Sequence, residues 1–436
     1  MHDLVGLSPR AFADHLLSLG ARRAYAVLGD DGELQLSHPA LADLGDFLRG
    51  RSPDFHGHEG VFLAVGEESR ALFGAFVHDT HRGLSQGGLR FWPYPTLTAF
   101  LADGLRLAQG MTRKNALAGL WWGGGKGIIA RDPDAPFRDP AYRRTLYREY
   151  GAFVTSLAGC YVTAEDAGTG AADMAEVFTA TRFVTCIPPA LGGSGNPSPA
   201  TAHGVVCAME GALDHLGMGD LAGKTIAMQG TGNVGAAMID ELLARGVARV
   251  IASEISRDRQ AELEARYAGR PVEVRLTDPG DNTILAEPCD IVAPNALGGV
   301  LSPTTIPTIR AKIICGAANN QLLDEVRDAE AIRARGLVYI PDFLCNRMGI
   351  VSCANEQYGY VDDDPAISRH FGREWENSVF LVTQRTLALA SAEGITTAAA
   401  AIRLADDLAR EEHPIWGHRG AAIIRSLVRT RWHEQG

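Results

Sequence analysis

Three observations predict an α/β protein of two domains. The chain has 436 residues, which is more than one typical domain holds. Short apolar runs typical of buried strands alternate with longer amphipathic patterns typical of helices. The glycine pattern GTGNVG at 230–235 lies between such a strand and such a helix. We therefore expect an N-terminal α/β domain followed by a domain built on a parallel sheet.

A segment rich in Gly, Pro and Ser marks the expected domain boundary. It reads GGSGNPSP at 192–199, a composition typical of linkers. Residues 1–195 are predicted to form the first domain and residues 196–365 the second. Residues 366–436 show helical patterns.

Charge and cysteine content exclude several classes of protein. The 41 Lys and Arg against 52 Asp and Glu give a net charge of −11, which disfavours nucleic acid and anionic membranes as partners. Seven cysteines without a CxxC motif indicate a reduced chain with no structural zinc. His56 and His58 lack a convincing third ligand, so they are interpreted as loop histidines and no metal is expected. A cytoplasmic location is expected, because neither a signal pattern nor a membrane-spanning run is found.

The first domain is predicted to begin with a helix over Ser8–Leu19, where Ser8 and Pro9 fit the N-cap and first turn. Residues 1–50 carry no recognisable chemistry and are interpreted as an assembly arm or a decoration. Two strands, VFLAVG and LFGAFVHD, follow. A helix over Leu101–Gln109 is expected to end at Gly110, and Tyr142–Leu157 forms another.

Two of the four lysines, Lys114 and Lys126, fall in the stretch MTRKNALAGLWWGGGKGII. A desolvated lysine amine can act as a base, whereas arginine cannot. Glycines flank Lys126 and would let a ligand approach, and Trp121-Trp122 offer an apolar wall that lowers its pKa. The alternative is a glycine turn with a surface lysine. A P-loop is excluded, because its spacing requires other residues than Leu120 and Gly127.

A second candidate is the carboxylate of Asp166, which follows a strand-like CYV in TAEDAGTG. A carboxylate at the end of a strand acts either as a helix cap or as a catalytic acid or base. Capping is the commoner role, and the residues alone leave both interpretations open.

The GTGNVG pattern supplies a more specific motif. The strand KTIAMQ precedes it, a helix follows, and a second strand, RVIASE, ends at Glu254, 19 residues after Gly235. This arrangement predicts a dinucleotide-binding βαβ unit, with the pyrophosphate at the helix N-terminus. Glu254 would accept hydrogen bonds from the ribose hydroxyls and repel a 2′-phosphate, which favours NAD; Arg257 and Arg259 keep NADP open.

Three further strands, DIVAP, KIICGA and LVYIPD, are followed by small and amide residues. Such residues suit a parallel sheet whose carboxyl edge holds a cofactor, although Asn and Gly are also common in ordinary loops. Together with the glycine unit, they give the candidate cofactor-binding residues: Gly230, Gly232, Asn233, Val234, Gly235, Glu254, Ala296, Ala317, Asn319 and Asn346.

Taken in order, the motifs resemble the Glu/Leu/Phe/Val dehydrogenase superfamily, most closely its leucine dehydrogenase branch. They include GGLRFWPY, LAQGMTRKNALAGLWWGGGKGII, TAEDAGT, GSGNPSPATAHGV, CDIVAPNALGGVL and AKIICGAANNQL, within residues 55–415; residues 1–50 lie outside. The resemblance implies an N-terminal α/β substrate domain, a Rossmann-like NAD-binding domain, and C-terminal helices that pack back on the first domain. It also implies a homo-oligomer.

The activity implied by the resemblance is NAD-dependent, reversible oxidative deamination of an L-amino acid to a 2-oxo acid and ammonia. By motif, Lys114 would hold the substrate α-carboxylate, Lys126 would be the base that activates water, and Asp166 would move protons to and from the amine. The remaining residues of the implied substrate pocket are Gln86, Gly87, Gly88, Ala164, Ile350 and Cys353. The resemblance also implies that Thr201 lines the cofactor.

Gln86 predicts a neutral substrate side chain. Glutamate-type members resemble one another in having lysine at this position, and leucine-type members in having leucine. A neutral glutamine cannot pair with a substrate side-chain carboxylate, yet its amide needs a hydrogen-bond partner. The pocket is therefore expected to be mostly apolar, with one polar handle. Arg347-Met348 also depart from the family pattern, which has Ala-Gly there.

Two other classes of function were weighed. A catalytically altered member would bind nucleotide or amino acid, or act as a biosynthetic partner; retention of Lys114, Lys126 and Asp166 argues against it. A hydroxyacid dehydrogenase is expected to use a catalytic histidine near the cofactor, and the sequence has none between His215 and His370.

Overall fold

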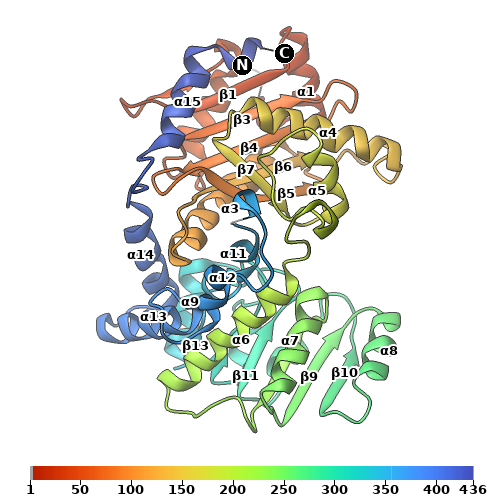
Figure 1. Cartoon of the computed structure of the whole chain (residues 1–436), viewed down its shortest axis with the longest axis vertical. Coiled ribbons are helices and arrows are strands. Elements are labelled where there is room, and N and C mark those ends of the chain that lie inside the picture. Colours follow the sequence, from red (N-terminus) through yellow and green to blue (C-terminus); the bar gives the residue numbers. More distant parts are fainter. Residues whose placement is uncertain (1–2, 355, 436) are drawn as a thin grey trace. The chain divides into compact units, whose positions relative to one another are not determined.

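The computed structural model describes residues 3–354 and 356–435, which fall into two compact units (Figure 1). Unit 1 comprises Met1–Asn196, Cys353–Tyr360 and Asp406–Gly436, and unit 2 comprises Pro197–Ser352 and Val361–Ala405. In the described part of the chain, no single helix is long and apolar enough to cross a membrane; two helices that meet at a bend of 113° pass that test only as a pair.

Unit 1 is built on one seven-stranded mixed sheet, in the order β2-β1-β3-β4-β6-β5-β7. Strands β5, β6 and β7 pair in parallel, whereas the other neighbours are antiparallel. The strands are β1 (Arg23–Leu28), β2 (Leu34–Leu36), β3 (Gly60–Val65), β4 (Leu72–Asp79), β5 (Ser85–Trp92), β6 (Gly123–Ala130) and β7 (Tyr161–Glu165). The helices are α1 (Pro9–Ser18), α2 (Ala42–Asp46), α3 (Leu97–Leu117), α4 (Pro140–Ser156), α5 (Ala171–Phe178) and α15 (Arg419–Arg429).

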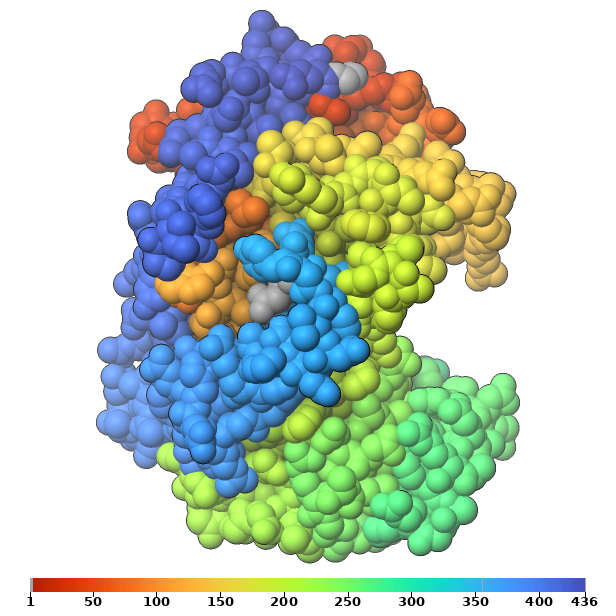
Figure 2. Space-filling view, in the orientation of Figure 1, coloured from red at the N-terminus to blue at the C-terminus, as the bar shows by residue number. Residues whose placement is uncertain are grey.

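Residues 3–50 are packed into the body of unit 1 and are not a separate arm or decoration; a role in assembly stays a prediction. Helix α1 begins as predicted, with the Ser8 hydroxyl accepting from the amide of Ala11. Phe12 and Leu16 are fully buried in the core, and β1 pairs with β3 over five residues. Within unit 1 the C-terminal residues (blue in Figure 2) also lie against this N-terminal segment (red), and Arg425 pairs with Asp30.

Helix α3 does not end at Gly110, contrary to the sequence prediction. It continues for two more turns to Leu117, because Thr112, Asn115 and Ala116 extend its buried face. Packing of that face on the sheet outweighs the modest helix propensity of one glycine. Lys114 is therefore a helical residue and not part of a loop.

Unit 2 contains a six-stranded sheet in which every pair formed by the described residues is parallel. Its order, β10-β9-β8-β11-β12-β13, is the 3-2-1-4-5-6 order of a dinucleotide-binding fold. The strands are β8 (Thr225–Gln229), β9 (Arg249–Glu254), β10 (Val272–Leu276), β11 (Ile291–Pro294), β12 (Ile313–Ile314) and β13 (Val338–Tyr339). The helices that lie wholly or mainly in unit 2 are α6 (Ser198–His215), α7 (Asn233–Ala244), α8 (Arg257–Arg266), α9 (Glu325–Ala334), α10 (Asp342–Cys345), α11 (Met348–Ala354), α12 (Pro365–Ser368), α13 (Val379–Glu393) and α14 (Thr397–Ala409).

The C-terminal helices divide between the two units, which corrects the expectation that all of 366–436 returns to the first domain. Within this C-terminal segment, the residues up to Ala405 belong to unit 2. Helix α13 packs closely on α6, where a Cβ on Gly211 would lie 2.9 Å from the carbonyl of Phe380. The return to unit 1 therefore begins at Asp406.

Candidate active site

Lys126 lies in the interior of the unit 1 sheet and is 4% exposed, so the interpretation as a surface lysine on a glycine turn is wrong. Its strand, β6, runs between β4 and β5. The flanking glycines allow this placement by close packing. A Cβ on Gly124 would lie 2.1 Å from the backbone nitrogen of Thr112 in α3, and one on Gly127 would lie 2.1 Å from the Tyr150 hydroxyl.

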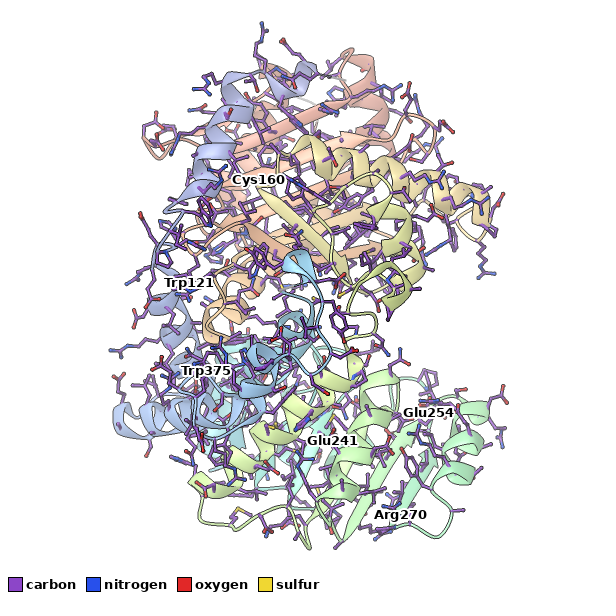
Figure 3. All side chains as sticks on the ribbon, viewed as in Figure 1. Trp121, Cys160, Glu241, Glu254, Arg270 and Trp375 are labelled. Atoms are coloured by element: carbon purple, nitrogen blue, oxygen red, sulfur yellow. The ribbon has the colours of Figure 1, made fainter. Side chains whose placement is uncertain are left out.

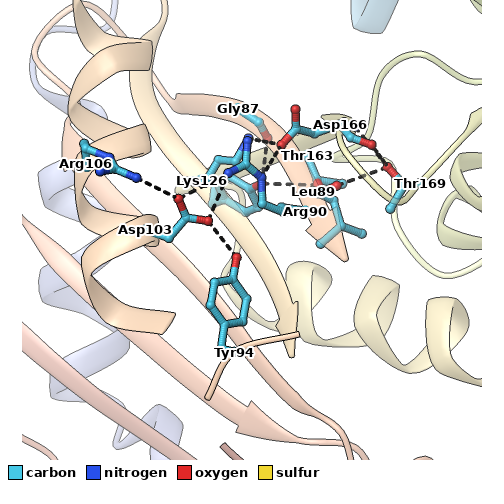
Figure 4. Close-up of polar contacts among 11 residues, drawn as sticks. Gly87, Leu89, Arg90, Tyr94, Asp103, Arg106, Lys126, Thr163, Asp166 and Thr169 are labelled. Atoms are coloured by element: carbon cyan, nitrogen blue, oxygen red, sulfur yellow. Dashed lines mark hydrogen bonds and ion pairs between the residues drawn. The ribbon is translucent and has the colours of Figure 1, made fainter. Parts of the chain in front are cut away.

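Lys126 belongs to a network of charged side chains (Figure 4). The Lys126 amine donates to Oδ2 of Asp166 at 2.6 Å, and Nε of Arg90 donates to the same oxygen at 3.1 Å. Arg90 also donates to Asp103 at 3.0 Å, and the hydroxyl of Tyr94 donates to Asp103 at 2.7 Å. Lys126 and Arg90 thus balance Asp166 and Asp103 within a largely buried group, and the exposed Arg106 also reaches Asp103 at 3.3 Å.

Electrostatics in this network separate the two candidate catalytic groups. Burial lowers the pKa of Lys126 below its ordinary 10.5, Asp166 opposes that shift, and Arg90 adds to it. Burial alone would raise the pKa of Asp166, but Lys126 and Arg90 together hold it well below its usual range. Asp166 is therefore ionised at neutral pH, while Lys126 is brought closer to the range in which an amine can act as a base.

The predicted cause of the Lys126 shift was wrong in one respect. Trp121 (Figure 3) is 40% exposed. The guanidinium carbon of Arg82 lies over its ring, 4.2 Å from the ring centroid. Trp122 packs with Val162. Burial in the sheet and the charge of Arg90, rather than a tryptophan wall, lower the pKa of Lys126.

Asp166 follows the last residue of β7 and does not cap a helix. Helix α5 has Gly170 as its N-cap, so the capping interpretation of Asp166 is wrong. The amide of Asp166 donates to the Thr169 hydroxyl at 2.9 Å, which fixes the turn after the strand. Gly88 makes room for it, because a Cβ there would lie 2.7 Å from the Cβ of Asp166.

The strand register places Gln86 and Ala164 on the face that carries Lys126. Gln86 pairs with Gly124, and Gly124 and Lys126 point to the same side because strand residues alternate. Ala164 pairs with Gly88, two positions further along β5. Gln86 is fully buried, and neither of its amide atoms has a hydrogen-bond partner among the described residues.

Helix α3 brings Lys114 towards the same sheet. Its residue Met111 lies 3.1 Å from the Cβ position of Gly87, and Lys114 is one turn further on the same side of the helix. Two other predicted pocket residues stay predictions. The thiol of Cys353 interacts with that of Cys186 in unit 1, and Ile350 belongs to unit 2.

We expect Gly87→Ala to destabilise the protein strongly, because its Cβ would lie 1.7 Å from the carbonyl oxygen of Gly125. Overpacking typically costs about 1–3 kcal/mol, and backbone atoms cannot move aside as a side chain can. The matched control is Gly110→Ala in α3, where a Cβ meets nothing within 4 Å. That change should stabilise by about 0.5–1 kcal/mol. Denaturant unfolding of both variants checks the prediction, and equal stabilities would contradict it.

In unit 2 the three motif glycines have three different structural roles. Gly230 has a φ of +92° and lies against Ala296, where a Cβ would be 2.9 Å from the Ala296 Cβ. A Cβ on Gly235 would lie 2.4 Å from the Gly230 carbonyl, so that glycine lets α7 pack on β8. Gly232 has open space around its Cβ position. This is where a pyrophosphate would approach the N-terminus of α7, which begins at Asn233 and Val234.

Glu254 ends β9 as predicted (Figure 3). Its carboxylate accepts from the amides of Ile255 and Ser256 at 2.8 and 2.9 Å, and from the hydroxyl of Thr231. Burial would raise the pKa of Glu254, but these hydrogen bonds lower it below the ordinary value. A charged carboxylate therefore lies at the position expected for the ribose. Arg259 is paired with Glu262.

Hydrogen bonds connect three of the predicted cofactor-binding residues at the carboxyl edge of the unit 2 sheet. The Asn346 amide donates to the carbonyl of Ala317 at 3.0 Å and to Oδ1 of Asn319 at 2.7 Å. Asn295 accepts from the Ala317 amide at 2.7 Å, while its own amide nitrogen has no partner among the described residues. Buried amide groups with spare capacity suit a ligand that carries a carboxamide or hydroxyls.

Thr201, Arg347 and Met348 lie near this edge, but their side chains contact other parts of unit 2. Arg347 and Met348 are the two residues that differ from the family pattern. The Thr201 hydroxyl donates to the carbonyl of Pro197 at 2.9 Å. Arg347 is fully buried, and burial lowers its pKa to about 9. Met348 is buried against Gly204 of α6. The two bulky residues therefore fill the interior of unit 2.

Arg90 and Asp103 were not among the predicted site residues. A usable signal was present, because Arg90 lies two residues after Gly88 and so shares a face with Gln86. Asp103 had no comparable signal, since a single acidic residue in an amphipathic helix is usually solvated. His58 lies in a loop, as predicted, but its ring is buried and bonded to the carbonyl of Leu105 at 2.8 Å.

Comparison with known proteins identifies the family of this chain. Residues 70–183 match the family model described as Glu/Leu/Phe/Val dehydrogenase, dimerisation domain, and residues 192–257 match Glutamate/Leucine/Phenylalanine/Valine dehydrogenase. Leucine dehydrogenase of Geobacillus stearothermophilus is 38% identical over 351 residues, which is 80% of this chain and 90% of that protein. Valine dehydrogenase of Streptomyces coelicolor is 38% identical over 362 residues, which is 83% of this chain and 94% of that protein.

Among solved structures, L-tryptophan dehydrogenase from Nostoc punctiforme is similar with a TM-score of 0.65 and 32% identity, covering 81% of this chain and 96% of that one. The predicted fold of an α/β domain followed by a Rossmann-like domain is confirmed by these relatives and by the strand order of unit 2. On this evidence the chain belongs to the Glu/Leu/Phe/Val dehydrogenase family, and it is an amino acid dehydrogenase that uses a nicotinamide cofactor.

Proposed function

We propose that this protein carries out reversible, NAD-dependent oxidative deamination of a neutral L-amino acid to its 2-oxo acid and ammonia. The observation that carries the proposal is the buried Lys126–Asp166 pair at 2.6 Å, with a lysine pKa lowered by burial. Leucine, valine and tryptophan dehydrogenases among the similar proteins support a neutral substrate. A catalytically silent family member is not favoured, since the pair is intact.

In this proposal each residue of unit 1 has a separate task. Lys114 pairs with the substrate α-carboxylate. Asp166, ionised and held by Arg90, accepts a proton from the substrate ammonium group. Neutral Lys126 then removes a proton from the water that adds to the imino acid, and the added oxygen becomes the carbonyl of the 2-oxo acid as ammonia leaves. When bound, the nicotinamide cofactor would supply the acceptor for the hydride lost from the substrate Cα, and this loss turns the amine into the imino acid before water adds.

The cofactor is proposed to be NAD rather than NADP, held by the glycine unit, Glu254 and the cluster around Asn346. A buried, charged carboxylate at Glu254 repels a 2′-phosphate, and Arg259 is occupied by Glu262. We expect a higher kcat/KM with NAD than with NADP, and a smaller difference in Glu254→Gln. Steady-state kinetics with both cofactors check this. A preference for NADP in the unmodified protein would contradict it.

The substrate side chain is proposed to be neutral, because Gln86 offers no charge to a substrate carboxylate. A buried amide without partners costs about 1–3 kcal/mol, which a hydrogen-bonding substituent on the substrate would recover. We expect glutamate to be the poorest of a panel with leucine, valine, methionine, phenylalanine, tryptophan and glutamine.

The matched variant for this pocket is Gln86→Leu. It should stabilise the free protein and raise kcat/KM for leucine relative to tryptophan or glutamine, because it removes an unsatisfied amide. Unfolding curves and kinetics on the same panel measure both effects. If glutamate had the highest kcat/KM of the panel, this account of the pocket would be wrong.

Unit 1 is proposed to bind substrate and to mediate assembly into a homo-oligomer, and unit 2 to bind the cofactor. The match of residues 70–183 to a family model that names dimerisation supports the assembly. A molar mass in solution above that of one 46.6 kDa chain, measured by light scattering, is the expected result.

A further inference from the structure

A second cluster of ionisable side chains in unit 1 takes no part in the proposed reaction. It consists of Glu59, His81 and His418, each of which offers one potential ligand atom, and these atoms lie within 4.8 Å of one another. Glu59 lies just before β3, His81 follows β4, and His418 precedes α15. The cluster therefore joins residues that are up to 359 positions apart in the sequence.

The carboxylate of Glu59 is held in one orientation. Its Oε1 accepts from the amide of Thr80 at 2.8 Å, and its Oε2 accepts from the Thr80 hydroxyl at 2.5 Å. Nε2 of His418 lies 2.9 Å from Oε1. The imidazoles of His81 and His418 stack at a centroid distance of 3.9 Å.

The carboxylate of Asp79 orients the imidazole of His81 so that one ring nitrogen remains available to bind an ion. Nδ1 of His81 lies 3.1 Å from Oδ2 of Asp79, and Oδ1 of Asp79 accepts from the His81 amide at 2.9 Å. This leaves Nε2 as the free ligand atom. A carboxylate on the far nitrogen of a histidine is the usual outer partner of a metal-bound imidazole, because it fixes the ring and its tautomer.

From this arrangement we propose that Glu59, His81 and His418 form a binding site for a divalent transition-metal ion of the zinc class. Two imidazoles and one carboxylate are a ligand set that zinc accepts, with water as the fourth ligand. Ligand atoms around a tetrahedral zinc lie about 3.3 Å apart, given bond lengths of about 2.0–2.2 Å. Binding would turn the two stacked imidazoles so that their nitrogens converge on the ion.

The site is accessible, since the side chains of His81 and His418 are 39% and 27% exposed. Its position suggests a structural effect. The segment before α15 is already tied to His81, whose carbonyl accepts from the amide of His413 at 2.9 Å, and Gly420 packs against Thr80. A bound ion would fasten this C-terminal segment to β3 and β4.

The test is a titration of the full-length, chelator-treated protein with Zn²⁺ by calorimetry, together with Co²⁺ absorption as a report of coordination. We expect one tight equivalent per chain, a tetrahedral Co²⁺ spectrum, and a Tm that rises with Zn²⁺. All three results should be lost in Glu59→Gln/His418→Gln. Asp79→Asn should weaken binding about 10–100-fold through loss of the outer partner.

His56→Ala is the matched control, because His56 is exposed and lies outside the cluster; its titration should equal that of the unmodified protein. Should the double variant fail to fold, each single variant gives the same comparison. If the unmodified protein bound Zn²⁺ no more tightly than the folded variants, or if His56→Ala lost the tight equivalent, the proposed site would be refuted.

Discussion

Replacing Lys126 with alanine is expected to lower kcat by about 10²–10⁴-fold, the usual contribution of a general base. The amine is buried, hydrogen-bonded to Asp166 at 2.6 Å, and has a lowered pKa. Lys126→Arg should be equally inactive, because a guanidinium keeps its charge and cannot accept the proton. Steady-state NADH formation with the best neutral amino acid measures the loss.

Two controls separate lost chemistry from lost structure. Binding of NAD, followed by fluorescence, should be unchanged in Lys126→Ala, because the residues proposed to hold the cofactor lie in unit 2. Lys224→Ala, a lysine outside both sites, should keep normal turnover. Near-normal kcat in Lys126→Ala would remove the lysine from the proposed mechanism.

Asp166→Asn is expected to cause a second loss of about 10²–10⁴-fold, since an amide cannot accept the substrate proton. The pH dependence of activity is a second, independent test. Activity should rise with pH as Lys126 becomes neutral, through a pKa below 10.5. Asp166 raises the pKa of Lys126, so the residual activity of Asp166→Asn should rise at lower pH than in the unmodified enzyme.

Arg90→Gln should shift the pH profile in the direction opposite to Asp166→Asn. Arg90 lowers the pKa of Lys126, so removal of its charge should move the rising limb of kcat/KM to higher pH. Arg90→Lys keeps the positive charge and should leave the limb near its normal position. A merely structural role for Arg90 would lower activity at every pH without moving the limb, and a shift of both variants in the same direction would contradict this electrostatic account.

The Rossmann-like unit could be predicted from the sequence because its constraints are local. A strand, three spaced glycines, a helix and an acidic residue at the next strand end all appear within 30 residues. Gly230 and Gly235 then prove to have steric reasons in the structure, whereas Gly232 borders open space. The division of the C-terminal helices could not be predicted in the same way, because an amphipathic helix such as α13 shows which face is buried but not which partner buries it.

The centre of the active site was predicted as separate residues rather than as a network. Lys126 and Asp166 were found because each follows an unusual local pattern. Their direct contact depends on the parallel pairing of β5 with β6 and β7, which joins segments far apart in the chain. The same strand pairing places Arg90, and helix α3 contributes Asp103. The sequence predicted that this helix ends at Gly110, whereas it extends to Leu117.

The central claim is that a neutral L-amino acid is deaminated by a buried lysine base in this network. The most direct measurement is the pH dependence of NADH formation from NAD and the panel of neutral amino acids and glutamate, with the unmodified protein and Lys126→Ala side by side. Turnover of a neutral amino acid should rise through a pKa below 10.5 and should be lost in the variant. Turnover that favours glutamate, or that survives in Lys126→Ala with the same pH profile, would contradict it.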